Sequence, residues 1–265
     1  MAFNDKFTRL KNDLNRMERV IIAYSGGVDS TLLLKVASLS GLREILAVTA
    51  SSESLPSGEL IFARQMTEDL DIRHEIIETN ELNDKNYADN PSDRCYYCKK
   101  ELFGKLKAIA AEKNFTYILD GSNQDDTIDW RPGRKAAAEL GIHSPLMDAG
   151  FGKKEIRDIS KYLGLPTWNK AATPCLSSRL PYGEKITSQA LEMVEQAENF
   201  IKKFGIKELR VRHHAETARI EILPEAFPRL MDGAVREKII AFLKSLGYKY
   251  VTLDLQGFRS GSLNE

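Results

Sequence analysis

The sequence predicts an α/β protein with a parallel sheet in residues 1–180 and a small α+β domain in residues 181–265. The first observation is the run at residues 20–24, which is apolar without interruption, as in a strand buried on both faces. The second is the alternation of short apolar runs with helical stretches, which is typical of parallel sheets built by crossover connections. The third is a change of order near Pro181, where this alternation stops.

The elements of the first domain follow from hydrophobic spacing and from residues that end helices. Phe7, Leu10, Leu14 and Met17 recur at helical spacing, so a helix is expected over residues 6–18. The predicted strands are 20–24, 45–50, 74–78 and 117–119, and the predicted helices are 31–39, 59–70, 99–113 and two within 134–164. The second domain is predicted as helix 187–204, strands 209–213 and 218–223, helix 235–246 and strand 248–255. A segment of this size buries little core alone, so we expect it to pack on the first domain or on another subunit.

Composition excludes several classes of protein. The 265 residues contain 38 basic and 38 acidic side chains, and neither predicted domain is strongly basic, as a dedicated nucleic-acid binder would be. No run approaches the ~18 apolar residues that a membrane span needs, and the N-terminus lacks an apolar signal core. Three cysteines are too few for a disulfide scaffold and suit a reducing compartment. We therefore expect a soluble, cytoplasmic protein that contacts neither membrane nor nucleic acid.

The strand–loop–helix unit at residues 20–39 carries the first informative motif, Ser25-Gly26-Gly27-Val28-Asp29-Ser30. Its glycines allow the backbone to approach a ligand closely, and the free amides of the first helical turn favour an anion. The loop lacks the Gly-Lys-Ser/Thr ending of a Walker A motif and the spacing of a dinucleotide fingerprint. A plain turn with a serine cap is the alternative interpretation.

This loop resembles the pyrophosphate loop of the PP-loop ATPases, a Rossmann-like group that is similar in fold to the adenine-nucleotide α hydrolases. The resemblance implies that ATP is cleaved between its α and β phosphates, giving an adenylylated intermediate and pyrophosphate, with Mg²⁺ on the leaving group. A second stretch, residues 120–126, follows strand 117–119 at the carboxyl edge, where open α/β sheets bind ligands, although a polar turn is its alternative. Residues 153–157 also resemble these families but alone indicate only an exposed helix start. The candidate ATP-binding residues are Ala23, Ser25, Gly26, Gly27, Val28, Asp29, Ser30, Gly121, Asn123 and Asp125.

The three cysteines form a second candidate site. Cys95-Tyr96-Tyr97-Cys98 is a C-x-x-C motif, expected in a loop before a helix, and Cys175 lies 77 residues later. A thioredoxin-like redox pair is one interpretation, and zinc with a histidine as fourth ligand is another. The third is an iron–sulfur cluster held by three thiolates, which would leave one iron open for an extra sulfide. Flanking cations favour thiolates and an anionic cluster; they are Arg94, Lys99, Lys100 and Arg179. The histidines available for zinc are His74, His143, His213 and His214.

A narrower resemblance spans essentially the whole chain and is most specific in four stretches: residues 129–133 (DWRPG), 168–179 (WNKAATPCLSSR), 209–213 (LRVRH) and 254–261 (DLQGFRSG). They resemble the LarE family of ATP-dependent sulfur transferases, which build the nickel-pincer nucleotide cofactor of lactate racemase. The resemblance implies that ATP adenylylates a carboxylate of a pyridinium dicarboxylate mononucleotide, and that sulfur then displaces AMP to give a thiocarboxylate. It also implies a sulfur donor and a homo-oligomer, by analogy a trimer-based hexamer.

Cys175 matches the sulfur-bearing cysteine of that family. Members described as sacrificial have only this cysteine and surrender its sulfur, leaving dehydroalanine. The additional Cys95 and Cys98 depart from that pattern and favour a [4Fe–4S] cluster with three cysteine ligands. The metal ligands expected are thus Cys95, Cys98 and Cys175, besides Mg²⁺ and ATP as cofactors.

The remaining candidates lie in the second domain. Arg210 and Arg212 are two apart on a strand and so share a face, which suits a substrate phosphate or carboxylate, although a solvated strand face is the alternative. Glu198 falls on the apolar stripe of its helix, where a carboxylate needs a partner. The family resemblance implies two further candidate catalytic residues, Arg259 and Glu237. The rival functions are a tRNA thiolase, an amidating synthetase and a nucleotide-sensing module without catalysis.

Overall fold

The computed structural model describes residues 3–127 and 131–259. Of the stretches that carry the family resemblance, residues 129–130 and 260–261 lie outside the described residues. Internal contacts divide the chain into two compact units, and each is described by itself. The first unit contains residues 1–81 and 93–173, and the second contains residues 82–92 and 174–265.

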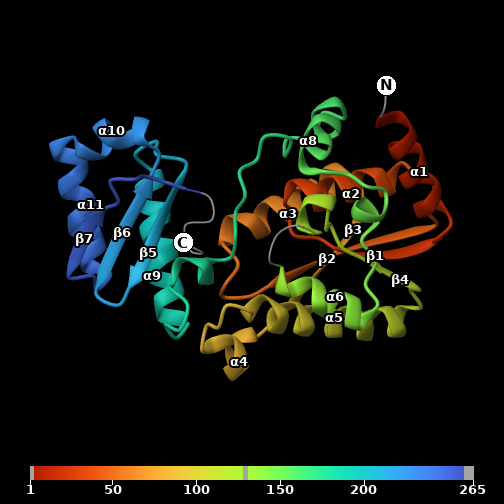
Figure 1. The fold of residues 1–265 in the computed structure, drawn as a ribbon, viewed down its shortest axis with the longest axis horizontal. Helices are drawn as coiled ribbons and strands as arrows, with labels where there is room; N and C mark the ends of the chain where they lie inside the picture. Colours follow the sequence, from red (N-terminus) through yellow and green to blue (C-terminus); the bar gives the residue numbers. More distant parts are fainter. Residues whose placement is uncertain (1–2, 128–130, 260–265) are drawn as a thin grey trace. The chain divides into compact units, whose positions relative to one another are not determined.

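The first unit is built on a four-stranded, all-parallel sheet with the order β3-β2-β1-β4 (Figure 1). This arrangement confirms the predicted α/β class and parallel sheet. The central strand β1 is almost fully buried because helices cover both faces of the sheet. The strands are β1 (Arg19–Ala23), β2 (Glu44–Ser51), β3 (Arg73–Glu78) and β4 (Tyr117–Leu119).

Two apolar cores lie on the two faces of this sheet. One core packs α1, α2, α7 and α8 around Leu14, Leu33 and Phe151, and the other packs α5 and α6 around Phe103 and Leu106 (Figure 1). The helices are α1 (Phe3–Asn15), α2 (Val28–Ser38), α3 (Ser57–Asp69), α5 (Arg94–Lys113), α6 (Pro132–Leu140), α7 (Pro145–Asp148) and α8 (Lys153–Tyr162). With helices on both faces, the ligand-binding positions of the sheet are the loops at the carboxyl ends of its strands.

The second unit contains a three-stranded sheet with the order β5-β6-β7, in which β5 and β6 are antiparallel and β6 and β7 are parallel. Its core packs α9 and α11 against one face of the sheet, around Ile201, Val211 and Leu243. The predicted order helix, strand, strand, helix, strand is confirmed. The elements are α4 (Lys85–Ala88), α9 (Ser188–Lys202), β5 (Leu209–His214), β6 (Thr217–Ile222), α10 (Phe227–Met231), α11 (Gly233–Ser245) and β7 (Tyr250–Leu253), with a 3₁₀ turn at Leu176–Arg179.

The structure corrects one local prediction and adds short elements. The C-x-x-C motif does not lie in a loop, because α5 begins at Arg94 and takes the motif into its first turns. Asp93, a residue type that is common at helix N-caps, precedes the helix, although its side chain makes no capping bond there. The short helices α4, α7 and α10 were not expected. Across residues 3–127 and 131–259, no helix is long and apolar enough to cross a membrane.

Candidate functional site

The loop between β1 and α2 presents free backbone amides at its predicted position. Gly26 has a φ of 70°, which a residue with a side chain rarely adopts, and Gly27 is the N-cap of α2. No side chain caps this helix, so the interpretation as a serine-capped turn is wrong. Instead, the hydroxyls of Ser25 and Ser30 lie 3.1 Å apart across the loop. The Ser30 hydroxyl also donates to the Gly27 carbonyl oxygen, so the two hydroxyls shape the loop, and the amides of the first turn of α2 are left for a ligand.

The second predicted stretch packs directly against this loop. Gly121 follows β4, and a Cβ added to it would lie 2.9 Å from the backbone nitrogen of Ser30. β4 and β1 are parallel neighbours, which brings the ends of both strands to the same edge of the sheet. Asn123 shapes the stretch by accepting a hydrogen bond from the Asp125 amide at 2.9 Å. The two candidate ATP-binding stretches thus form one continuous surface.

Two lysines from outside the predicted site reach the Ser25–Ser30 loop. Lys153, the first residue of α8, forms an ion pair with Asp29, and its backbone amide donates to Asp125 at 2.8 Å. Lys170 donates to the Gly26 carbonyl oxygen at 3.1 Å and to Glu59 at 2.7 Å. Burial raises the pKa of Asp29, and the charge of Lys153 opposes that shift. From the sequence alone, Lys153 was interpreted as part of an exposed helix start, and Lys170 was not singled out. The sequence did carry one signal for them, because the Ser25–Ser30 loop contains no lysine or arginine of its own.

The two cysteines of the C-x-x-C motif lie in the first turns of α5. Cys95 is exposed and Cys98 is half-buried, and their spacing of three places both on one face of α5. Among the residues that the structure describes, no three His, Cys, Asp or Glu side chains form a group that could hold a metal. Because Cys175 belongs to the other unit, the three-thiolate cluster stays a prediction.

The segment that carries Cys175 is held by a buried arginine in the second unit. Arg179 donates to the carbonyl oxygens of Pro174 and Cys175, at 2.7 and 3.1 Å. Its guanidinium also pairs in a bidentate manner with Glu198, at 2.8 and 3.0 Å, and both side chains are about 5% exposed or less. Glu198 in turn accepts from the Val211 amide of β5. The apolar stripe of α9 therefore contains a carboxylate because a buried guanidinium neutralises it.

The two arginines of β5 lie in different surroundings although they share a face. Arg212 is buried and pairs with Glu221 at 3.0 Å, and it donates to the Ser178 carbonyl oxygen at 2.6 Å. Arg210 is 6% exposed and stacks on the Phe258 ring, 4.9 Å from its centroid. Within the described residues Arg210 has no hydrogen bond and no ion pair. Burial, with the charges of Arg179 and Arg212, lowers the pKa of Arg210 to about 10.

The interpretation of β5 as a solvated face is therefore wrong, since both arginines are buried. Arg210 is a buried cation beside two others, and such a group needs an anion. Arg259 lies in the turn after β7 next to Phe258, and its guanidinium is 4.0 Å from Asp254. Glu237 is exposed on α11 and has no ion pair among the described residues. The structure thus brings together Arg179, Glu198, Arg210 and Arg212 near the Cys175 segment, and leaves Glu237 without a contact to this cluster.

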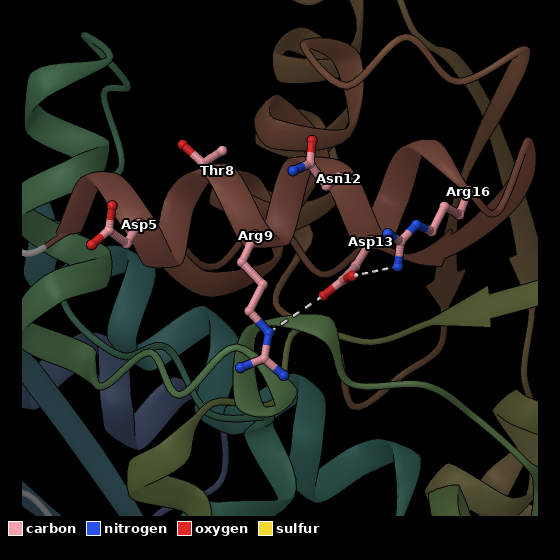
Figure 2. A pocket seen from close by; sticks show the side chains of 6 residues that line it. All are labelled: Asp5, Thr8, Arg9, Asn12, Asp13 and Arg16. Atoms are coloured by element: carbon pink, nitrogen blue, oxygen red, sulfur yellow. Dashed lines mark ion pairs between the residues drawn. The ribbon is translucent and has the colours of Figure 1, made fainter.

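A surface hollow of about 350 Å³ on α1 is a weaker candidate (Figure 2). Its lining side chains all come from one helix, and two of its arginines are tied to Asp13 by ion pairs within that helix. None of the predicted site residues lines it. It is lined by Asp5, Thr8, Arg9, Asn12, Asp13 and Arg16.

A parallel sheet with a glycine–serine loop after its first strand fits the PP-loop ATPase class of α/β proteins, which the loop sequence resembles. Comparison with known proteins identifies the family within this class. A relative from Lactiplantibacillus plantarum, pyridinium-3,5-bisthiocarboxylic acid mononucleotide synthase, is 41% identical over 95% of this chain and 91% of its own length. The chain belongs to this family, the LarE family.

Two further relatives match the chain over nearly its whole length. An uncharacterized protein of Synechocystis sp. is 43% identical over 98% of this chain and 97% of its own length. An uncharacterized protein of Methanocaldococcus jannaschii is 32% identical over 98% of this chain and 100% of its own length. No family model matches the chain.

Gly121→Ala should destabilise the protein by about 1–3 kcal/mol, because the new methyl group would press on the backbone of Ser30. Urea unfolding measures the change. Gly104→Ala is the matched control, since an added Cβ there has nothing within 4 Å and alanine is the better helix former. Equal stability of the two variants would show that the loops do not pack as described.

Glu198→Ala should cost about 3–5 kcal/mol of unfolding free energy, because it leaves Arg179 buried without its carboxylate. The control is Glu216→Ala, which removes an exposed ion pair with Lys249 and should cost less than about 1 kcal/mol. Chemical denaturation of both variants provides the comparison, and a small effect of Glu198→Ala would contradict the described burial.

Proposed function

We propose that this protein is an ATP-dependent sulfur transferase. It adenylylates a carboxylate of a pyridinium dicarboxylate mononucleotide and replaces it with a thiocarboxylate, a step in nickel-pincer nucleotide cofactor biosynthesis. The named relative, at 41% identity over almost the whole chain, supports this substrate class. The observation that carries the proposal is the unneutralised Arg210, in the same cluster that fixes the backbone of Cys175.

The activation step uses the loop at the carboxyl edge of the parallel sheet. The amides of the first turn of α2 and the hydroxyls of Ser25 and Ser30 suit the phosphates of ATP, with Mg²⁺ as their counter-ion. A carboxylate oxygen of the substrate attacks the α-phosphorus, the bond to the β-phosphate oxygen breaks, and pyrophosphate leaves. The product is an acyl-adenylate, which is activated because AMP is a good leaving group.

The transfer step takes place at the Cys175 segment. A sulfur nucleophile attacks the acyl carbon, a carbon–sulfur bond forms, and the carbon–oxygen bond to AMP breaks. Arg210 and Arg212 stand on the strand beside this segment, and Arg210 is the cation left to bind the phosphate or the second carboxylate of the substrate. Arg259 and the exposed Glu237 are further candidates for contacts with the substrate, with less support from the structure than Arg210 and Arg212.

The cysteine pattern suits a sulfur that is delivered repeatedly. Cys95, Cys98 and Cys175 would hold a [4Fe–4S] cluster, whose open iron supplies a site for an additional sulfide. The position of Cys95 and Cys98 at the start of α5 fits such ligands. A homo-oligomer and a separate sulfur donor belong to the same proposal. A tRNA thiolase is the second candidate, and the balanced charge of the chain disfavours it.

The decisive experiment follows one anaerobic preparation through turnover with ATP and the pyridinium dicarboxylate mononucleotide. We expect brown protein with about four irons per chain, release of AMP and pyrophosphate, and an unchanged mass at Cys175. A loss of about 34 Da would mean that Cys175 gave up its own sulfur as in the sacrificial members. Protein that releases neither AMP nor pyrophosphate would refute the proposed function.

Arg210→Gln should raise the KM for the mononucleotide by about tenfold or more, because it removes a charge-assisted contact to an anion. The wild-type KM should also rise as the pH increases through about 10, where Arg210 loses its proton and its attraction for the anion. Steady-state kinetics between pH 7 and about 10.5 test both effects.

Arg236→Gln is the control for Arg210→Gln, because Arg236 is an exposed arginine on α11. Its KM should match that of the wild type at every pH. Equal KM values for Arg210→Gln and Arg236→Gln would remove Arg210 from the substrate site.

A further inference from the structure

We propose that Lys170 is a positioning residue for the sulfur-transfer step. It ties the segment that leads to Cys175 to the loop at residues 25–30, so that the sulfur meets the acyl-adenylate before water does. This inference rests on the proposed function and gives a role to a residue outside the predicted ATP-binding and catalytic residues.

The acyl-adenylate of the proposed reaction reacts with water as well as with sulfur. When water attacks the acyl carbon, the carbon–oxygen bond to AMP breaks, the carboxylate is restored and a proton is released. AMP and pyrophosphate then form without any thiocarboxylate. Correct placement of two reacting groups can raise their rate of reaction by orders of magnitude, so productive transfer requires that the sulfur be held close to the acyl carbon.

The backbone at Lys170 is anchored to α8. The Arg157 guanidinium donates to the carbonyl oxygens of Trp168 and Lys170, at 2.8 and 2.9 Å. The amides of the same two residues donate to the carbonyl oxygens of Leu165 and Thr167. Residues 165–170 are therefore fixed within the first unit by both side-chain and backbone hydrogen bonds.

The Lys170 side chain extends this anchor to the loop at residues 25–30. Its ammonium group donates to the Gly26 carbonyl oxygen at 3.1 Å and to Glu59 at 2.7 Å, and it lies 3.9 Å from the centroid of the Phe62 ring. The Lys170 side chain is 20% exposed. Because Glu59 compensates the charge of Lys170, the contact with Gly26 fixes position and adds little net charge to the loop.

A short exposed connection joins this anchor to Cys175. Residues 171–173 are exposed, and within the described part of the chain none of them takes part in a backbone–backbone hydrogen bond. The first unit ends with these residues, and in the second unit Arg179 holds the carbonyl oxygen of Cys175. Cys175 is five residues after Lys170, so the covalent chain limits the distance between their Cα atoms to about 18 Å. The point at which Lys170 is attached therefore limits how far the sulfur can lie from the loop.

The test measures the thiocarboxylate formed per AMP released in Lys170→Met and in Lys161→Met. Lys161→Met is the matched control, because it removes an exposed lysine whose ammonium group lies 4.5 Å from the centroid of the Trp168 ring and leaves the contacts of Lys170 intact. Anaerobically prepared protein is given ATP and the pyridinium dicarboxylate mononucleotide, and both products are quantified from the same reaction by chromatography and mass spectrometry. Lys170→Met should lower the ratio about three- to tenfold and keep AMP release within about threefold of the wild type, because adenylylation continues while water intercepts the intermediate. Lys161→Met should match the wild type in both.

A longer connection tests the same inference with Lys170 intact. Six residues of Gly-Ser repeat, inserted between Ala171 and Ala172, place Cys175 eleven residues after Lys170 instead of five. The effective concentration at the end of a flexible linker falls roughly as the −3/2 power of its length, so the ratio of thiocarboxylate to AMP should fall about threefold. AMP release should be unchanged, because the loop and its contacts with Lys170 are untouched.

Three outcomes would overturn the inference. If AMP and thiocarboxylate fall in parallel in Lys170→Met, Lys170 acts on the activation of the substrate alone. An unchanged ratio in Lys170→Met or in the insertion variant would show that the attachment does not position the sulfur. An equal loss in Lys161→Met would show that any disturbance of the segment has the same effect. Wild-type protein that releases neither AMP nor pyrophosphate would instead refute the proposed function itself.

Discussion

The bidentate pair of Arg179 and Glu198 is the interaction on which the organisation of the second unit depends. It joins three segments that are distant in sequence: the turn after Cys175, helix α9, and strand β5 through the Val211 amide. Both side chains are buried, and removing one charge would leave the other without compensation. The geometry around Cys175 is therefore set by the same contact that attaches the turn to the core.

Each unit contains one buried charged group that is not fully paired with an opposite charge. In the second unit Arg179 and Arg212 have carboxylate partners, whereas the equally buried Arg210 contacts the ring of Phe258 and has no ion pair among the described residues. In the first unit Asp29 has one oxygen paired and the other buried without a partner among the described residues. A buried charge without compensation is costly, and a substrate anion or a metal ion is the natural completion of each. The two incomplete positions are of opposite sign, as a site for Mg²⁺ and a site for an anionic substrate require.

Hydrophobic patterning predicted most of the fold because β1 and its neighbours are buried on both faces and read as continuous apolar runs. The loop at Ser25–Ser30 could be placed for the same reason, since it follows such a strand directly. Lys153 and Lys170 could not be found in this way: each meets the loop across more than 120 residues of sequence, and neither lies in a local motif. The burial of Arg210 also depends on packing, because a strand with alternating arginines reads equally well as a solvated face.

The way in which the Cys175 segment is held bears on the chemistry of its sulfur. Arg179 fixes the backbone carbonyl oxygens of Pro174 and Cys175, and Tyr87 holds Ser177 through a buried hydrogen bond at 2.7 Å. Neither contact involves the sulfur atom. The turn therefore keeps its shape whether that sulfur is a free thiolate, a cluster ligand or has been given up. The proposed sulfur transfer needs this independence, because the same turn then serves a Cys175 that holds a cluster and a Cys175 that gives up its own sulfur.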